Sequence, residues 1–317
     1  MITISIIMAT YNSAQYVIQA LNSIKWQTYQ PSEIIITDDG STDDTLLICR
    51  DWLEKNPIYK EITKILSVHR NTGAVANYQR GYDAISKECE WVKKLDGDDV
   101  LTPNCLLKYK KFIEENPNAH VIASTIIPFT TESQLRALDE NNFEQNFSHK
   151  LLGGETVEKQ REYFDYFEMF SLTPTLIIKR DVFETVRNDI RIPMIGDVPF
   201  SRNLLYNNIK IYYMPEATVF YRVVDSISHS TKRFYNPVFI ESIMKYRKYY
   251  QQVTPRTIFG QFVRLKKWLA TKRMHIFYVT LKNTPTPISS FLFNATGMFI
   301  SKYNQFLIKI FFKFKIK

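Results

Sequence analysis

The sequence predicts an α/β fold in which a mainly parallel sheet is covered by helices on both faces. Apolar runs of strand length alternate with segments of helical apolar spacing along the first 125 residues, and short connections join them. In addition, a polar cluster follows each of the first four predicted strands. The chain of 317 residues is long enough for one sizeable domain and an appendage.

Four strand and helix pairs are predicted in order along this first part. The predicted strands cover residues 3–9, 33–37, 62–68 and 91–95. The predicted helices cover residues 14–26, 42–53, 74–86 and 103–114. We expect Ser41 or Thr42 to cap the second of these helices, because a hydroxyl there can accept from the first free backbone N–H groups.

The pattern weakens after a fifth predicted strand over residues 119–127. Residues 130–152 are polar and have little periodicity, which predicts an irregular segment. Order returns with a helix over 157–170, a strand over 175–178, a helix beginning in 180–186, and two strands near 209–213 and 218–221.

The polar clusters lie where four of the predicted strands end, at residues 10–13, 38–41, 70–73 and 96–99. Ligands of such sheets bind at the carboxyl ends of the strands, where the following loops converge. Independent surface turns would not all be expected to fall at these ends. We therefore expect the four clusters to form one binding site.

Three carboxylates in four positions, Asp96, Asp98 and Asp99, mark the candidate centre of this site. Carboxylates this close repel one another unless a positive group lies between them. A divalent cation such as Mn²⁺ or Mg²⁺ prefers oxygen ligands and is commonly shared with nucleotide phosphates. The alternative is an ordinary acidic turn before a helix that begins near Thr102 and Pro103.

Charge distribution and cysteine content indicate the cellular compartment of the chain. Residues 242–317 hold 15 Lys or Arg and no Asp or Glu, so the rest of the chain has a net charge of about −6. The three cysteines show no Cys-x-x-Cys spacing, which argues against a disulfide framework or a zinc site and favours a reducing compartment. The start lacks a basic leader, and there is no run of about 18 apolar residues, so we expect a cytoplasmic chain.

Several short stretches, taken in this order, resemble the family 2 glycosyltransferases, an inverting group with the GT-A fold. They are residues 5–12 (SIIMATYN), 27–29 (QTY), 36–43 (ITDDGSTD), 71–73 (NTG), 77–81 and 95–99 (LDGDD). The resemblance covers residues 1–125 and continues weakly to about residue 230. It implies a GT-A domain over 1–230, with a nucleotide-sugar half to residue 125, and a helical basic extension over 231–317.

The resemblance implies a nucleoside site at the ends of the first two strands. Thr10, Tyr11 and Asn12 match the position that the family uses for the nucleoside. Asp39 can accept a hydrogen bond from the ring N–H of uracil or thymine, whereas Asp38 can serve mainly to shape the turn. These residue types suit a flat base that carries one N–H donor.

The acidic cluster and two arginines match the rest of a nucleotide-sugar site. Asp96 is expected at the ribose hydroxyls and as a metal ligand. Asp98 resembles the metal ligand of the family, with Asp99 as an alternative or supporting partner. Arg70 and Arg80 are candidates for the diphosphate, although an isolated Arg is commonly a solvated side chain.

Asp197 is the expected general base, which takes the proton of the acceptor hydroxyl. The family usually has two consecutive acidic residues here, and this chain has Gly196 before Asp197, so a simple helix cap is the alternative. A second departure is Val224, at a position where many relatives carry a His. His229 lies close enough in sequence to be considered instead.

The end of the chain has the pattern of a helix in a membrane interface, with Lys302, Lys309, Lys313 and Lys317 opposite an apolar face. Residues 259–278 can add to it. The alternative is a helix packed on protein, and the acidic body argues against nucleic acid. The apolar face consists of Phe299, Ile300, Tyr303, Phe306, Leu307, Ile310, Phe311 and Phe314.

Taken together, these features predict a metal-dependent inverting glycosyltransferase with a nucleotide-sugar donor, expected to be UDP-linked. The expected acceptor is a glycan or lipid-linked hydroxyl of a bacterial surface polysaccharide, at the cytoplasmic face of the inner membrane. One rival is a nucleotidyltransferase, which generally has a Gly-rich loop with Arg or Lys after its first strand, and residues 9–13 lack both. The other is a membrane adapter with a decayed nucleotide site.

Overall fold

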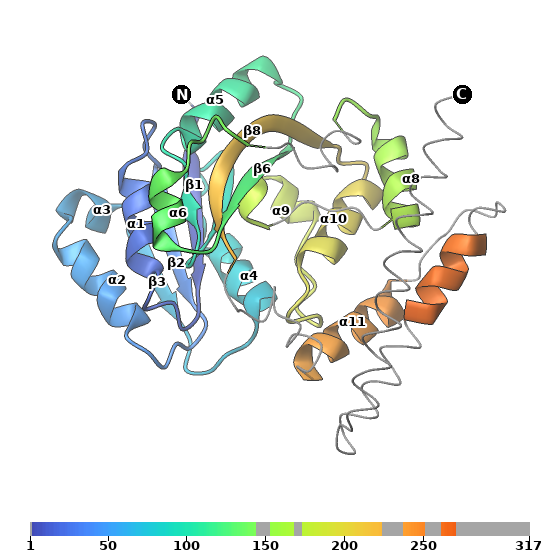
Figure 1. Ribbon diagram of the computed structural model, residues 1–317, viewed down its shortest axis with the longest axis horizontal. Helices are drawn as coiled ribbons and strands as arrows, with labels where there is room; N and C mark the ends of the chain where they lie inside the picture. Colours follow the sequence, from blue (N-terminus) through green and yellow to red (C-terminus); the bar gives the residue numbers. More distant parts are fainter. Residues whose placement is uncertain (1, 144–152, 168–172, 224–236, 251–260, 271–317) are drawn as a thin grey trace. The chain divides into compact units, whose positions relative to one another are not determined.

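The computed structural model describes residues 2–143, 153–167, 173–223, 237–250 and 261–270 (Figure 1). The chain divides into two compact units. Unit 1 consists of Met1–Arg161 and Phe170–Ser226, and unit 2 consists of Glu162–Met169 and Ile227–Lys317. Every candidate site residue except His229 belongs to unit 1.

Unit 1 is built on a sheet whose described strands follow the order β3-β2-β1-β4-β7-β6-β8-β5. The pairs β1–β2, β1–β4 and β2–β3 are parallel, as is β6–β8, whereas β7 is antiparallel to both of its neighbours and β5 to β8. The strands are β1 (Ile4–Thr10), β2 (Glu33–Asp38), β3 (Thr63–Ser67), β4 (Trp91–Asp96), β5 (Val100–Leu101), β6 (Val121–Phe129), β7 (Leu176–Lys179) and β8 (Ile211–Arg222).

Helices cover both faces of the sheet. Side chains of α1, α2 and α5 share one apolar core with β1 and β2, and α4 packs on the other face. All seven residues of β1 are buried. A Cβ on Gly81 of α4 would lie 2.5 Å from Ile7, so this glycine allows the helix to approach β1 closely. The prediction of an α/β fold with both faces covered is therefore confirmed.

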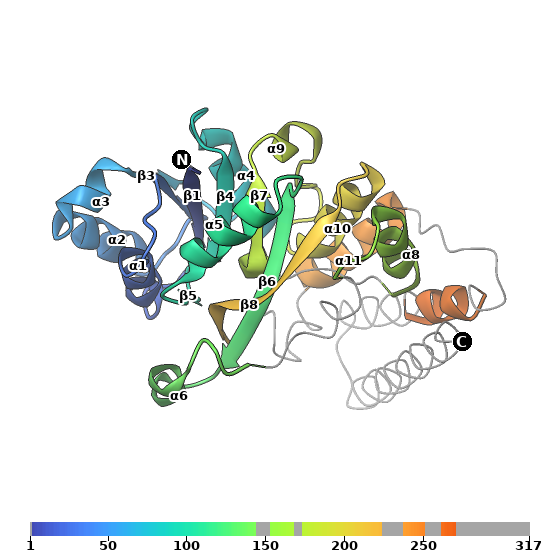
Figure 2. The same ribbon diagram turned by 90° about the horizontal axis from the view of Figure 1, so that it is seen from above.

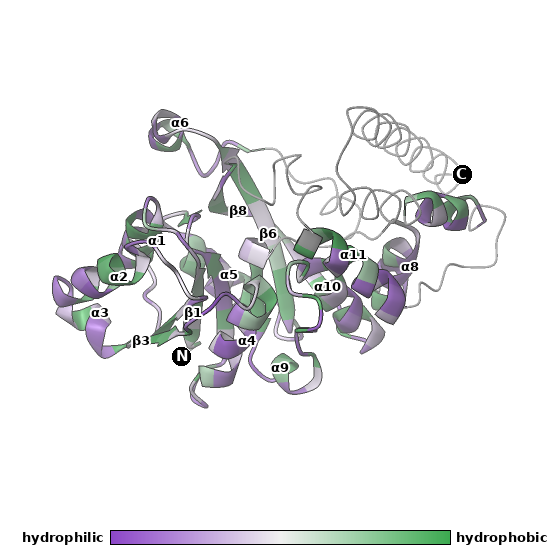
Figure 3. Ribbon diagram, turned by 90° about the horizontal axis from the view of Figure 1, so that it is seen from below, coloured by the Kyte–Doolittle hydropathy of each residue, from purple (hydrophilic) through white to green (hydrophobic). Residues whose placement is uncertain are grey.

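The described helices mostly match the predicted ones, with shifted ends. They are α1 (Val17–Lys25), α2 (Thr45–Glu54), α3 (Pro57–Glu61), α4 (Ala74–Ala84), α5 (Cys105–Glu115), α6 (Glu132–Ala137), α8 (Val157–Phe167), η1 (Thr173–Thr175, 3₁₀), α9 (Val182–Thr185), α10 (Asp197–Tyr206) and α11 (Pro237–Tyr249). A further helix covers 261–270. Figure 3 shows hydrophobic residues along β6 and mixed colouring on the surface helices.

Three local predictions were wrong. Residues 130–152 are not irregular throughout, because α6 forms there with a capping box between Thr131 and Gln134, beyond the end of β6 (Figure 2). The two predicted strands around residue 215 are one strand, β8, which continues past Pro215 with register shifts against β6. Finally, α2 begins at Thr45, so neither Ser41 nor Thr42 caps it.

Unit 2 contributes α11 and the helix over 261–270 to the described structure. The apolar and basic pattern over 299–317, and His229, lie outside the described residues. No helix in the described ranges combines the length and the apolar character needed to cross a bilayer.

Candidate functional site

The carboxyl ends of β1, β2 and β4 meet at one edge of the sheet. The register pairs Thr10 with Asp38 and Ala9 with Asp96, so the polar residues that follow these three strands lie side by side. This is the position at which an open α/β sheet binds its ligand.

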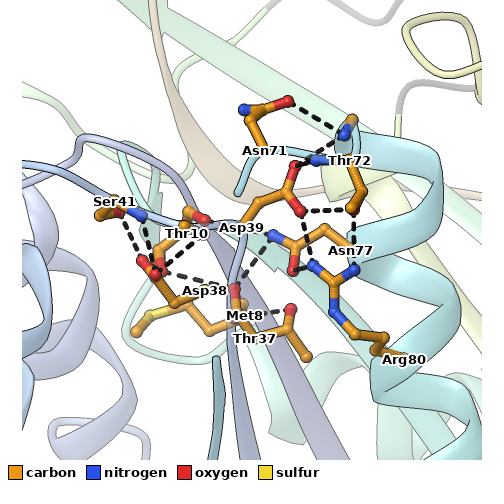
Figure 4. Close-up of polar contacts among 12 residues, drawn as sticks. Met8, Thr10, Thr37, Asp38, Asp39, Ser41, Asn71, Thr72, Asn77 and Arg80 are labelled. Carbon is orange, nitrogen blue, oxygen red and sulfur yellow. Dashed lines mark hydrogen bonds and ion pairs between the residues drawn. The ribbon is translucent and has the colours of Figure 1, made fainter. Parts of the chain in front are cut away.

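Asp38 shapes the turn after β2. Its carboxylate accepts hydrogen bonds from the backbone N–H groups of Gly40 (3.1 Å) and Ser41 (2.9 Å), from the Thr10 hydroxyl (3.1 Å) and from the Ser41 hydroxyl (Figure 4). The side chain is fully buried. These contacts agree with a turn-forming role, and they leave the Thr10 hydroxyl directed at Asp38.

The buried carboxylate of Asp39 forms an ion pair with Arg80, whose side chain is 24% exposed, with 2.6 Å between Oδ1 and Nη2. The same carboxylate accepts from the Thr72 hydroxyl (2.6 Å), the Thr72 N–H (3.0 Å) and the Gly73 N–H (2.7 Å). Arg80 also donates to Thr72 and to Asn77 (Figure 4). A buried carboxylate needs such compensation. The structure thus pairs these two residues with each other, which differs from the expected contacts of Asp39 with the base and Arg80 with the diphosphate.

Tyr11, Asn12 and Arg70 lie at the open side of the same edge. Tyr11 and Arg70 are exposed. Asn12, at a positive φ of 49°, joins two loops: its N–H donates to the Ser41 hydroxyl (2.9 Å) and its side-chain oxygen accepts from the Thr42 N–H (2.9 Å). Tyr11, a candidate for the nucleoside, and Arg70, a candidate for the diphosphate, therefore both have side chains that are accessible to a ligand.

The acidic turn, residues 96–99, closes against the end of β1. The Gly97 N–H donates to the Ala9 carbonyl (2.8 Å), and a Cβ on Gly97 would lie 2.8 Å from Cγ2 of Thr10, so the close contact requires glycine. Asp96 accepts from the Tyr78 hydroxyl (2.7 Å). Burial, followed by the repulsion of Asp98, raises the pKa of Asp96 to about 7.

The other two carboxylates of the turn differ in exposure. Asp99 is buried; Oδ1 accepts from the Arg222 N–H (2.9 Å), and Oδ2 has no hydrogen-bond partner among the residues that the structure describes. Burial, and then the charges of Asp98 and Asp96, raise the pKa of Asp99 well above its usual value. Asp98 is only partly buried. Asp98 is therefore the carboxylate of this pair that a ligand reaches more readily.

These residues fit a divalent cation. Asp98 raises the pKa values of both Asp96 and Asp99, and among the described residues one buried oxygen of Asp99 lacks a partner, so a cation would relieve this repulsion. Within the described ranges no three His, Cys, Asp or Glu side chains form a complete ligand set. Mg²⁺ is commonly bound by one or two carboxylates together with the phosphates of a nucleotide.

Asp197 is the first residue of α10, and its charge interacts with that of Asp96 in the acidic turn. Burial raises its pKa, while a hydrogen bond from the Thr173 hydroxyl and the charge of Lys94 oppose the rise. Asp197 in turn raises the pKa of Asp96. The two carboxylates are therefore close enough to interact, and a raised pKa is typical of a general base.

Two residues of the site were not predicted from the sequence. Lys94 is buried, and its ammonium lies 4.5 Å from the ring centre of Phe200, 5.2 Å from that of Tyr78 and 5.4 Å from that of Tyr82. Its pKa is lowered to about 8 by burial. A lysine inside the apolar run 91–95 was the available signal. The second residue, Arg222, contacts the acidic turn from β8.

The comparisons with known proteins concern the family and the fold of the chain. A family model described as "Glycosyl transferase family 2" matches residues 5–186. A relative named "Uncharacterized glycosyltransferase" from Haemophilus influenzae is 31% identical over 121 residues, which is 38% of this chain and 36% of the relative. "Minor teichoic acid biosynthesis protein GgaB" from Bacillus subtilis is 24% identical over 221 residues, 69% of this chain and 23% of that protein. The chain thus matches about a third or less of the length of these relatives.

Two solved structures share the fold. S. aureus TarS 1-349, in complex with UDP-GlcNAc, superposes with a TM-score of 0.53 at 16% identity, over 96% of this chain and 90% of that chain. The mannosyltransferase PcManGT from Pyrobaculum calidifontis, in complex with GDP-Man and Mn²⁺, gives 0.56 at 14% identity, over 96% and 83%. At these identities the likeness shows the architecture alone.

Proposed function

The chain belongs to the family 2 glycosyltransferases, and on this premise we propose that it transfers a hexosyl or N-acetylhexosaminyl group, with inversion, from a UDP-sugar. The proposed acceptor is a hydroxyl of a glycan or lipid-linked acceptor in bacterial surface polysaccharide synthesis. The observation that supports the proposal best is the acidic turn at the shared end of β1, β2 and β4, with Asp197 in electrostatic contact with it.

We assign the donor to the edge formed by residues 10–12, 38–41 and 96–99. Tyr11 would contact the base, Asp96 the ribose, and Arg70 the diphosphate, because Tyr11 and Arg70 are exposed there and Asp96 is partly exposed. Asp39 and Arg80 would act indirectly, by holding the loop at residues 72–73 in place. Part of this assignment revises the roles that the resemblance implied.

Asp98, with Asp96, would hold Mn²⁺ or Mg²⁺ together with the donor phosphates, and Asp99 would support the turn from within. A cation bound there would neutralise the negative charge that develops on the leaving diphosphate. Asp197 would accept the proton of the acceptor hydroxyl as that oxygen attacks the anomeric carbon, from the face opposite the leaving group. The Thr173 hydroxyl orients the Asp197 carboxylate for this step.

We further propose that residues 1–230 form the catalytic domain and that the basic region 231–317 attaches the enzyme to an anionic membrane at the cytoplasmic face. The support is the charge distribution, with 15 basic and no acidic residues over 242–317. Each basic residue close to an anionic surface contributes about 1 kcal/mol, so about five lysines in contact with the membrane would give a reversible attachment. The teichoic acid relative is a protein of surface polymer synthesis, by its name.

The test uses the purified chain with several UDP-sugars and GDP-mannose, with Mn²⁺ or with excess chelator. We expect release of the nucleoside diphosphate UDP from one UDP-sugar, and loss of that release with chelator. Asp98→Asn should lower turnover about a hundredfold, which corresponds to about 3 kcal/mol of lost stabilisation of the leaving group. Asp51→Asn, the same change on the exposed face of α2, serves as the control.

Each alternative outcome would indicate a different function or mechanism for this chain. Release of pyrophosphate from a nucleoside triphosphate, with no reaction of nucleotide sugars, would identify a nucleotidyltransferase. Neither hydrolysis nor metal-dependent binding of any nucleotide would identify a non-catalytic adapter. Unchanged turnover of Asp98→Asn would remove the acidic turn from the mechanism.

A further inference from the structure

Arg222, the last residue of β8, is buried although it carries a charge, with 2% of its side chain exposed. Burial of a guanidinium is costly unless its N–H groups find partners. In the described structure these partners come from three different parts of unit 1. The arrangement therefore serves to join those parts.

The first set of contacts is made to the acidic turn. The Arg222 backbone N–H donates to Oδ1 of Asp99 (2.9 Å), and Nε donates to the backbone carbonyl of Asp98 (2.8 Å). One residue thus binds the side chain of Asp99 and the main chain of Asp98. Because these bonds hold both the inner carboxylate and the peptide beside Asp98, they restrict the conformations that the turn can adopt.

The second set of contacts anchors the guanidinium itself. Nη1 donates to Oε1 of Glu132 on α6 (2.8 Å), and Nη2 donates to the side-chain oxygen of Gln19 on α1. Gln19 also donates to Glu132 (2.7 Å), which closes the network. The rings of Tyr16 and Phe129 lie 4.3 and 4.5 Å from the guanidinium carbon.

The contacts of Arg222 with α6 and its contacts with the acidic turn can be tested separately. The bond to Glu132 ties Arg222 to α6, at the surface, where the Glu132 side chain is 48% exposed. The Nε bond to the Asp98 carbonyl acts on the turn, beside the bond that the Arg222 backbone N–H donates to Asp99. A variant of Glu132 therefore loses the ion pair of Arg222 while the contacts with the acidic turn are kept.

We propose that Arg222 is a positioning residue that holds the acidic turn in the conformation that binds a divalent cation together with the nucleotide diphosphate. The proposal rests on the proposed function, because it takes the turn to be the cation site. Arg222 acts through Asp98 and Asp99 and is not itself assigned a contact with the cation or the sugar. Partners that orient metal ligands typically change metal affinity 10- to 100-fold when they are removed.

The experiment measures UDP binding by calorimetry at increasing Mn²⁺ concentrations, so that it does not depend on transferase activity. Arg222→Met keeps an unbranched apolar stem but removes the guanidinium group and its hydrogen-bond donors. It should raise the Mn²⁺ concentration for half-maximal binding about tenfold or more. Glu132→Gln, the matched control, should stay within about twofold of the wild type.

Arg222→Lys is measured in parallel, and it also serves if Arg222→Met fails to fold. Lysine keeps the charge but cannot form the planar fork that reaches the Asp98 carbonyl, Glu132 and Gln19 together. We expect Arg222→Lys to raise the Mn²⁺ requirement about fivefold or more.

Three results would overturn the inference. A Mn²⁺ requirement of Arg222→Lys equal to that of the wild type would show that the charge alone matters. An equal rise in Glu132→Gln would show that Arg222 acts by fixing α6 and not the turn. A wild-type chain that binds no nucleotide with Mn²⁺ would instead overturn the proposed function and, with it, this inference.

Discussion

Replacing Lys94 by methionine should make the protein more stable and the enzyme less active. Lys94 is buried, and the negative charges of Asp197 and Asp96 favour its charged ammonium form. Methionine has a similar unbranched stem, fills the same space and carries no charge. The substitution therefore removes a buried cation with little change in packing.

The magnitude follows from the pKa of Lys94, which burial lowers from 10.5 to about 8. At about 1.4 kcal/mol per pKa unit, keeping this ammonium charged in the folded state costs about 3 kcal/mol, a value that already includes the attraction of Asp197 and Asp96. Losing the cation–π contacts with three rings offsets about 1 kcal/mol. We expect Lys94→Met to raise the free energy of unfolding by about 2 kcal/mol at pH 7.

The pH dependence provides an internal check. Between pH 8 and 10.5 the unfolded chain binds the Lys94 proton and the folded chain does not, so this residue makes wild-type stability rise with pH across that window. Below pH 8 the cost of the charge is fully present. The advantage of Lys94→Met should therefore be largest near pH 7 and vanish near pH 10.5.

The assay is urea unfolding followed by far-UV circular dichroism at several pH values, with initial rates of sugar transfer measured on the same samples. Lys60→Met, at a side chain 53% exposed, is the control and should change stability by less than about 0.5 kcal/mol. Transfer by Lys94→Met should fall, because Asp197 loses the positive charge that opposes the rise of its pKa. A Lys94→Met protein that unfolds at the same or lower urea concentration, with no dependence on pH, would refute the reasoning.

Three further predictions concern neighbouring residues. Gly97→Ala should lower the free energy of unfolding by about 1 to 3 kcal/mol, because its Cβ would lie 2.8 Å from Thr10; a thermal midpoint equal to the wild type would show that the turn can move. Asp39→Asn should destabilise by about 1 to 3 kcal/mol in urea unfolding, since the partly exposed Arg80 loses its anionic partner, and an unchanged midpoint would contradict a stabilising ion pair. Transfer activity should decline on acidification at a pH above the usual carboxylate value, because burial raises the pKa of Asp197 and its protonated form cannot accept a proton; an activity that is constant down to pH 4 would argue against Asp197 as the base.

The first half of the fold was predictable because its signals are local. Apolar runs and helical spacing specify the strands and helices up to α5, and parallel strands joined by helices bring their carboxyl ends to one edge. The polar clusters at residues 10–13, 38–41, 70–73 and 96–99 were therefore expected near one another from the sequence alone. The capping box of α6, in contrast, was a local signal that the weak periodicity of residues 130–152 concealed.

The partners of the buried charges depended on the tertiary structure. Asp39 pairs with Arg80 across 41 positions, and Asp99 accepts from Arg222 across 123 positions. No periodicity links such residues, because their contact follows from how β8 returns along β6 and how α4 packs on β1 and β2. Local chemistry in the sequence thus determined which residues gather at the end of the sheet. Only the packing of distant segments decided which of those charges neutralise one another and which remain for a ligand.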